Sequence, residues 1–469
     1  MGFRGLLIAS LLVGGLAEAR PGGGGSYRSS GSRSSSSSSS RASGSHGSSY
    51  SSSGSSGGSS LTDDEARNML IVFGGIAVIF ALIVLVGRRN QRRQRAGVAR
   101  DDAARQRALA ALKARDPGFD EAKFAARART VMAAVNAAWT ASDMRPARAL
   151  ISDGVFVRFQ TQLALLKRAD VRNVMADWQA VSAEVVAAES DALWDTLHVK
   201  MVGRARDTEV AASASATEAS AAARAAELED YEEVWSFVRR RGQTSHATLP
   251  ALEGKCPGCG ATVVLSETVK CTHCKGLLNS GEHDWVLAEI TQPEAWDPER
   301  ASGDVPGLEA LRAQDPAVSR QALEDRASMI FWKWIAARAT GERHRLDRFC
   351  LQPGVPALSA ESLRDVAVGA CELSSASAGD GLDRVTVAVT WSGATGDDYV
   401  NATDLFTLAR ASGVRSSGGL ASLDCPTCGG ALAESDDAKC RWCGEALSGG
   451  RHEWALEAVA RAEERAVAA

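Results

Sequence analysis

Eight cysteines fall into two sets that share one spacing, C-x2-C, eleven residues, then C-x2-C. The first set is Cys256, Cys259, Cys271 and Cys274, and the second is Cys425, Cys428, Cys440 and Cys443. The sets lie 169 positions apart, and similar tails follow them, GEHDW at 281–285 and GRHEW at 450–454. Each C-x2-C turn presents two thiolates, so two turns supply the tetrahedral sulfur shell that Zn²⁺ prefers. The spacing predicts two zinc ribbons, each closing one copy of a duplicated module.

A shell of four thiolates leaves zinc no open position for water, so we expect two structural zinc ions rather than catalytic ones. In small zinc peptides, binding releases roughly 10–16 kcal/mol, enough to fold a segment this short. Redox dithiols are the alternative, but they need only one C-x-x-C each. His283 and His452 are surplus to the shell and are expected to pack on the ribbons, with Trp285 and Trp454 beside them as core anchors.

The charge around the ribbons does not favour nucleic acid as a partner. Lysines near the first ribbon are opposed by Glu253 and Glu267, and acidic residues outnumber Lys439 and Arg441 around the second. Binding to phosphates needs a basic face. We therefore expect no nucleic-acid binding.

No motif in the chain indicates an enzyme. Walker, G-x-G-x-x-G and H-E-x-x-H patterns are missing from the sequence, and its one G-x-S-x-G match, at 54–58, falls in a Gly/Ser-rich stretch rather than between a strand and a helix. Asp116, before Pro117, more simply starts a turn or caps a helix. The alternative is a small-molecule-binding protein or acid–base enzyme that uses the cavity of an α+β cone. A buried carboxylate among convergent polar groups would favour that enzyme, and a cavity filled by Phe, Val and Trp would favour a scaffold.

The N-terminal part of the sequence indicates export followed by a membrane anchor. Residues 1–19 have the basic start, apolar run and A-x-A site of a signal peptide, and residues 20–62 form a Gly/Ser-rich spacer. Residues 69–87 contain no charge and would span about 28 Å as a helix, which matches a bilayer core. Arginines follow this span, so the positive-inside rule predicts a single pass with the spacer outside and the C-terminal domains in the cytoplasm. A reducing compartment also suits thiolate zinc sites.

The segment 88–115 is strongly basic and rich in helix-forming residues. Beside a membrane, each Lys or Arg gains about 1 kcal/mol near anionic lipid. The alternative is that these charges only fix the topology. We expect lipid contact from the five arginines nearest the span, which are Arg88, Arg89, Arg92, Arg93 and Arg95.

Beyond Asp116, the hydrophobic spacing predicts helices and then antiparallel strands. Phe124, Val131, Val135 and Trp139 fall on one helical face, a second helix is expected over 156–167, and the period then changes to two. The Ala/Ser-rich stretch 210–226 is expected as a loop or weak helix. The run Arg239, Arg240 and Arg241 ends a strand and is expected at a solvated edge. This order of elements predicts an α+β domain.

The unit recurs in weaker form. LKARDPGF at 112–119 matches LRAQDPAV at 311–318 with an offset of 199, whereas WSFV at 235–238 matches FTLA at 406–409 with an offset of 171. The falling offset predicts that the second copy has lost residues, first in its helical part and then between strands. We expect these boundaries: a first domain at 116–250, a ribbon at 251–291, a linker at 292–312, a shortened second domain at 313–420 and a second ribbon at 421–458.

Residues 116–290 resemble the bacterial relatives of the C-terminal domain of the forty-four-kilodalton subunit of the mitochondrial inner-membrane translocase. Residues 315–458 share this resemblance only through the duplication. The positions that carry it are Asp116-Pro117, Phe124, Ala138-Trp139, the SDG at 152–154, Phe159-Gln160, Arg172-Asn173 and the strand 235–238.

The resemblance implies a cone of helices on a curved antiparallel sheet, similar to the nuclear transport factor two superfamily. It also implies a bacterial inner membrane and a tethering role, with contacts to acidic lipid and to protein partners. We therefore expect a membrane-anchored, zinc-binding scaffold that serves protein transport or membrane-protein biogenesis, and the two cones are expected to pair within the chain.

Overall fold

The computed structural model describes residues 102–246, 248–263, 269–298, 304–395, 398–416, 419–420, 422–432 and 437–462. The predicted signal peptide, spacer, membrane span and lipid-binding arginines, Arg88 to Arg95, lie outside these residues. Within the described ranges, none of the helices has both the length and the apolar character needed to span a bilayer.

The first unit begins with helices and continues as a sheet. A helix over 102–115 precedes α2 (Glu121–Thr140), the 3-10 helix η1 (Arg145–Leu150) and α3 (Asp153–Arg168). Side chains of Asp120 and Ser152 cap α2 and α3 by accepting hydrogen bonds from backbone N–H groups two or three residues into each helix. Four antiparallel strands follow in the order β1 (Val171–Ser190), β2 (Trp194–Ala211), β3 (Leu228–Arg240) and β4 (Val286–Thr291).

The stretch expected as a loop or weak helix, 210–226, contains α4 (Ala216–Ala225). A reciprocal capping box between Ser215 and Glu218 starts this helix. Its buried face, Ala219 and Ala223, packs on Val174 of β1.

One face of the first sheet packs on α2. Leu197, Val199 and Met201 of β2 share the core with Phe124 of α2 and Phe237 of β3, whose rings meet edge to face with centroids 5.5 Å apart. Alternate side chains of a strand point to opposite faces, so Thr196 and His198 lie on the other side of this sheet.

The first ribbon interrupts the sheet rather than following it. Strand β3 ends at Arg240, the cysteines come next, and β4 then pairs antiparallel with β3. The range expected for the ribbon, 251–291, therefore includes β4, which the structure assigns to the sheet.

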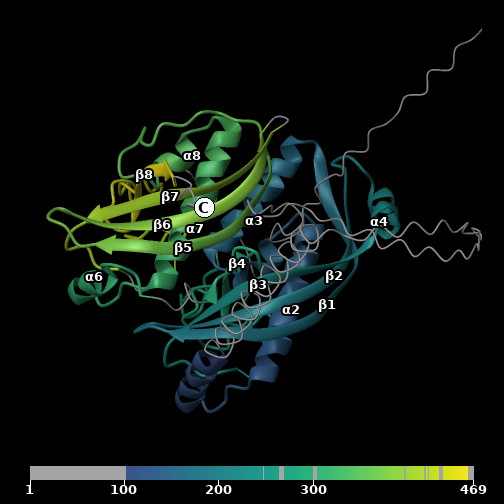
Figure 1. Ribbon diagram of the computed structural model, residues 1–469, viewed down its shortest axis with the longest axis horizontal. Helices are drawn as coiled ribbons and strands as arrows, with labels where there is room; N and C mark the ends of the chain where they lie inside the picture. Colours follow the sequence, from purple (N-terminus) through teal and green to yellow (C-terminus); the bar gives the residue numbers. More distant parts are fainter. Residues whose placement is uncertain are drawn as a thin grey trace, which may run out of the picture. The chain divides into compact units, whose positions relative to one another are not determined.

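The second unit repeats this plan. Its helices are α6 (Leu308–Gln314), α7 (Arg320–Thr340) and α8 (His344–Asp347), and its sheet has the order β5 (Leu363–Ser377), β6 (Leu382–Thr395), β7 (Asp398–Ala411) and β8 (Ala455–Arg461). Figure 1 shows the two sheets, β1 to β4 in teal and β5 to β8 in green to yellow. The α+β fold class is thus confirmed, with two four-stranded antiparallel sheets packed with helices.

The falling offset has a structural explanation. In the described residues, nothing corresponds to α3 between α8 and β5, and β6 and β7 join through a short connection where β2 and β3 are joined through α4. The long helix is retained, since α7 has 21 residues and α2 has 20. The loss in the helical part is therefore confined to α3.

The two units contact each other through α3, which packs on α7 and β5. Thr161 donates to the carbonyl of Trp332, and Gln162 donates to the carbonyl of Val366. Nearby, the backbone N–H of Gln292 donates to the carbonyl of Gly369. The helix that the second unit lacks is thus supplied to it by the first unit.

The expectation that Arg239 lies at a solvated strand edge is wrong. Its side chain is fully buried, 3.0 Å from Asp116, and its guanidinium lies 4.5 Å from the ring centroid of Trp285. Asp116 also accepts hydrogen bonds from the backbone and hydroxyl of Ser245. Asp116 therefore provides the counter-charge for the buried guanidinium of Arg239, a role that its position before Pro117 did not indicate.

Candidate metal centres

The structure brings each set of four cysteines together. In the first set, Cys256 Sγ lies 3.7 Å from Cys274 Sγ, and Cys259 Sγ lies 3.7 Å from Cys271 Sγ. In the second, the corresponding distances are 3.8 Å from Cys425 to Cys443 and 3.7 Å from Cys428 to Cys440. All four sulfur atoms of a set lie within 4.8 Å of one another. Both clusters are consistent with metal sites.

These distances can be compared with the two chemistries that cysteine pairs offer. A tetrahedral ion with Zn–S bonds of about 2.3 Å separates its sulfur ligands by about 3.8 Å. A disulfide needs about 2.05 Å. The observed 3.7 to 3.8 Å therefore fits a tetrahedral shell and not a disulfide.

Backbone hydrogen bonds shape each pair of cysteines. In the first ribbon, the N–H of Gly260 donates to the carbonyl of Cys256, and the N–H of Lys275 donates to the carbonyl of Cys271. Gly429 and Gly444 make the equivalent bonds in the second ribbon. All four residues have positive φ, which suits the three glycines and makes Lys275 the exception.

The same turns influence the thiols. Backbone N–H groups of Cys274 and His273 lower the pKa of Cys271 to about 6. Burial acts against ionisation of Cys440, but N–H groups of Cys443 and Trp442 bring its pKa to about 6 as well. Each cluster thus holds one thiol that ionises readily at neutral pH, and a metal ion would displace the protons that remain on the others.

The residues expected to support the ribbons do so. The ring of His283 packs on Gly258, between Cys256 and Cys259. The approach is so close that a Cβ at Gly258 would lie only 2.8 Å from His283 Nε2. His452 Nε2 lies 3.1 Å from Glu445 Oε1 in the second ribbon. Trp285 and Trp454 are buried, as predicted for core anchors.

The tails after the ribbons dock on the long helices in the same way in both copies. Asp284 pairs with Arg127 of α2 at 2.6 Å, and Glu453 pairs with Arg326 of α7 at 2.8 Å. The sequence comparison found the tails but missed these arginines. The repeat could have identified them, because Arg127 and Arg326 are 199 positions apart, which is the offset between LKARDPGF and LRAQDPAV.

Asp153 connects the two ribbons. Its Oδ1 accepts a hydrogen bond from Nδ2 of Asn279 in the first ribbon at 2.9 Å, and its Oδ2 accepts one from the backbone N–H of Leu423 in the second at 2.8 Å. Arg148 lies 3.5 Å from the same carboxylate. The carboxylate is buried at the start of α3, so this contact is shielded from water.

A second contact joins the ribbons directly. Lys270 pairs with Asp424 at 2.9 Å and also donates to the carbonyl of Gly429, just after the first knuckle of the second ribbon. Lys270 is one of the lysines near the first ribbon that Glu253 and Glu267 were expected to oppose. The structure pairs it with the acidic ribbon instead.

Aromatic and aliphatic side chains fill the space between each long helix and its sheet. In the first unit these include Phe124, Val131, Val135, Trp139, Trp235 and Phe237, all buried. In the second, Phe331 and Trp334 pack on Trp391 and Phe406 with ring centroids 5.5 to 6.3 Å apart. In both units these aromatic side chains form part of the buried core.

Residues 105–248 match the family model of the Tim44-like domain. The match covers the first unit as far as the start of the first ribbon, which is less than half of the chain. The predicted resemblance is thus shown for one domain, and the second unit is similar to it in its sheet, its long helix and its four-cysteine cluster.

A solved structure described as an Ntf2 like protein involved in plasmid conjugation is 10% identical over a match that covers 68% of this chain and 93% of that one, with a TM-score of 0.15. A likeness this weak has no bearing on fold or function. No curated protein shows significant sequence similarity to the chain.

Proposed function

We propose that this protein is a membrane-anchored scaffold in which two structural zinc ions lock a pair of Tim44-like units into one cytosolic platform. The observation that supports it best is Asp153, which receives hydrogen bonds from both ribbons through one buried carboxylate. Zinc would hold Cys256, Cys259, Cys271 and Cys274 in one site and Cys425, Cys428, Cys440 and Cys443 in the other. Four thiolates complete the tetrahedron, so the metal supplies folding energy and no reactive water.

The zinc ribbons have a specific place in this platform. Each one lies in the chain between the third and fourth strands of its sheet, and the tail after it pairs with the long helix. A folded ribbon therefore fixes where β4 and β8 start, and loss of metal would release an edge strand of each sheet.

The membrane half of the proposal comes from the sequence. Residues 69–87 would form the single span, the spacer would lie outside, and Arg88, Arg89, Arg92, Arg93 and Arg95 would contact anionic lipid on the cytoplasmic side. The match to the Tim44-like domain supports a role in protein transport or membrane-protein biogenesis, with protein partners on the units. The packed aromatic cores support a non-enzymatic protein over an enzyme of the cone cavity.

Crosslinking in intact cells, followed by identification of the captured proteins, tests the tethering role. Recovery of components of a translocation or membrane-insertion apparatus is expected, at a level that drops when Cys271→Ser and Cys440→Ser are combined. Recovery of only soluble metabolic enzymes would contradict the proposal.

A further inference from the structure

A polar pocket lies where the two units meet. Its walls come from the face of the first sheet opposite α2, from the first turns of α7 and from β5. Thr196, His198 and Ser236 contribute from the sheet, and Arg320 and Glu324 contribute from α7. The pocket is separate from the two cone interiors, which aromatic side chains fill.

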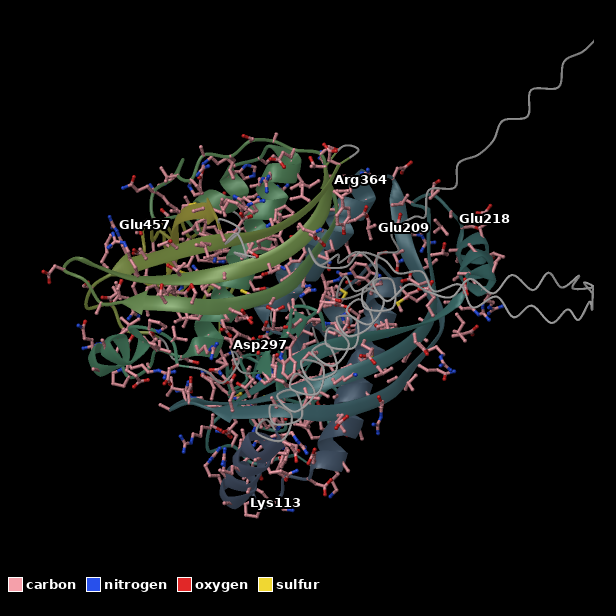
Figure 2. All side chains as sticks on the ribbon, viewed as in Figure 1. Lys113, Glu209, Glu218, Asp297, Arg364 and Glu457 are labelled. Carbon is pink, nitrogen blue, oxygen red and sulfur yellow. The ribbon has the colours of Figure 1, made fainter. Side chains whose placement is uncertain are left out.

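Negative charge dominates this pocket. Six carboxylates and one guanidinium, that of Arg320, line it. The six carboxylates are those of Glu189, Glu289, Asp297, Glu324, Asp325 and Glu372. Among them, Asp297 is labelled in Figure 2. Even with Arg158, which pairs with Glu289 at 3.0 Å, acidic groups outnumber basic ones. The charge suits a cation and opposes an anion.

Hydrogen bonds hold the walls in place. His198 lies between Ser236 Oγ, 2.9 Å from Nδ1, and Glu189 Oε1, 3.3 Å from Nε2. Gln321 donates to the same oxygen of Glu189 at 3.1 Å, which ties the first sheet to α7. Glu324 Oε1 accepts from Arg320 and from the backbone N–H of Leu373. The polar groups are thus preorganised by residues of both units.

Two polar atoms at this pocket lack a hydrogen-bond partner among the described residues. One is the hydroxyl of Thr196, a residue only 2% exposed, and the other is Oε2 of Glu289. A buried polar group without a partner costs about 1–3 kcal/mol. Both atoms can accept a hydrogen bond, so a donor placed beside either of them would satisfy it.

The donor set suits an organic cation better than a metal ion. Within the described part of the chain, the two cysteine clusters are the groups in which three or more ligating His, Cys, Asp or Glu atoms come within 4.8 Å. The pocket carboxylates are spread more widely than a coordination shell. Trp296 also lines the pocket, with its ring centroid 6.1 Å from that of His198, and offers an aromatic surface to a charged nitrogen.

We propose that this pocket binds a small organic cation with a primary ammonium group. The ammonium would donate to Thr196 Oγ1, and the carboxylates of Glu289, Glu324 and Glu189 would balance its charge. Because both units build the pocket, bound ligand would also strengthen their contact. This site is independent of the proposed zinc and membrane roles.

Calorimetric titration of the purified full-length protein at pH 8, where Glu324 is ionised, tests this site with putrescine as the probe. Two probes of similar length serve as controls, neutral 1,4-butanediol and anionic succinate. Putrescine is expected to bind, and the other two are expected to give no heat. No heat from putrescine at up to about 10 mM, or binding of succinate in its place, would overturn the proposal.

Variants identify the site. Thr196→Val keeps the side-chain shape and removes the hydroxyl, and Glu324→Gln keeps the shape and removes the charge. Each is expected to weaken putrescine binding about tenfold or more. Glu457→Gln changes the Arg384 pair elsewhere on the second unit and is expected to bind as the parent does. Equal affinity of Thr196→Val and the parent protein would exclude this pocket as the putrescine site. Because valine and threonine have nearly the same shape, Thr196→Val is expected to fold, so this test stands even if Glu324→Gln fails to fold.

Discussion

Asp116 and Arg239 form a buried ion pair at 3.0 Å, and Asp315 and Arg410 repeat it at 2.8 Å in the second unit. In both copies the backbone N–H of a serine, Ser245 or Ser416, donates to the same carboxylate. The guanidinium of Arg410 lies 4.4 Å from the centroid of the Trp454 ring, as Arg239 does from Trp285 at 4.5 Å. This repeated pair connects the start of each unit to the end of its third strand and to the tail of its ribbon.

Replacing Asp116 by Asn is expected to destabilise the protein by about 3–5 kcal/mol, because Arg239 would remain buried without its counter-charge. Denaturant unfolding at pH 7 measures the change. Asp230→Asn is the matched control: its pair with Arg204 is exposed to solvent, so the loss of stability there should be much smaller. Equal losses for the two variants would contradict the role of Asp116.

The same pair predicts sensitivity to acid. Burial opposes ionisation of Asp116, but hydrogen bonds from Ser245 and Arg239 outweigh it and lower the pKa of this carboxyl below its usual 3.8. The folded state therefore holds this proton less tightly than the unfolded state does. The stability that ionised Asp116 contributes is present above about pH 4 and is lost as the pH falls through the lowered pKa. Asp116→Asn should flatten the dependence of unfolding free energy on pH below about pH 4. An unchanged dependence in this acidic range would contradict the lowered pKa of Asp116.

Glu324 predicts the opposite slope. Burial, aided by Glu189, raises its pKa to about 7, although Arg320 and the N–H of Leu373 act against the rise. The folded state binds this proton more tightly than the unfolded state, so stability should fall as pH rises from about 4.5 to about 7. The effect is of the order of 1–3 kcal/mol. Melting temperatures of the parent protein and of Glu324→Gln, measured between pH 5 and 8, should show that the substitution removes this slope. Parallel pH profiles of the two proteins would refute the raised pKa of Glu324.

Asp153 predicts a link between the ribbons. Asp153→Ala removes the acceptor for Leu423 and Asn279, so the second ribbon should detach from α3 more often while its own cysteines stay clustered. Hydrogen exchange of residues 422–432 is expected to increase about tenfold or more. Lys270→Ala, which removes a partly exposed pair, should change it less. Unchanged exchange in Asp153→Ala would show that the ribbons are held by other contacts.

The sequence was most informative where a pattern is local. The C-x2-C pairs located both clusters because one turn fixes two sulfurs, and the 3.6-residue spacing of Phe124, Val131 and Val135 located α2. Alternation at Leu197, Val199 and Met201, and at Trp235 and Phe237, likewise located the centres of β2 and β3, although both strands extend well beyond these residues.

Long-range pairing was harder to predict. Arg239 follows two apolar residues at the end of a strand, and only its contact with a carboxylate 123 positions earlier explains its burial. The role of Asp153 depends in the same way on Leu423, 270 positions later. The pocket between the units needed both of them in place, so the contact between Glu189 and Gln321, which lie 132 positions apart, carried no signal in the sequence.

Zinc content of the purified full-length protein tests the central claim most directly. Metal analysis should give two zinc ions per chain, one in Cys271→Ser and one in Cys440→Ser, with the ribbon of the intact set still resistant to protease. Protein that is folded and free of metal, or a Cys271→Ser variant that keeps two zinc ions, would contradict the account.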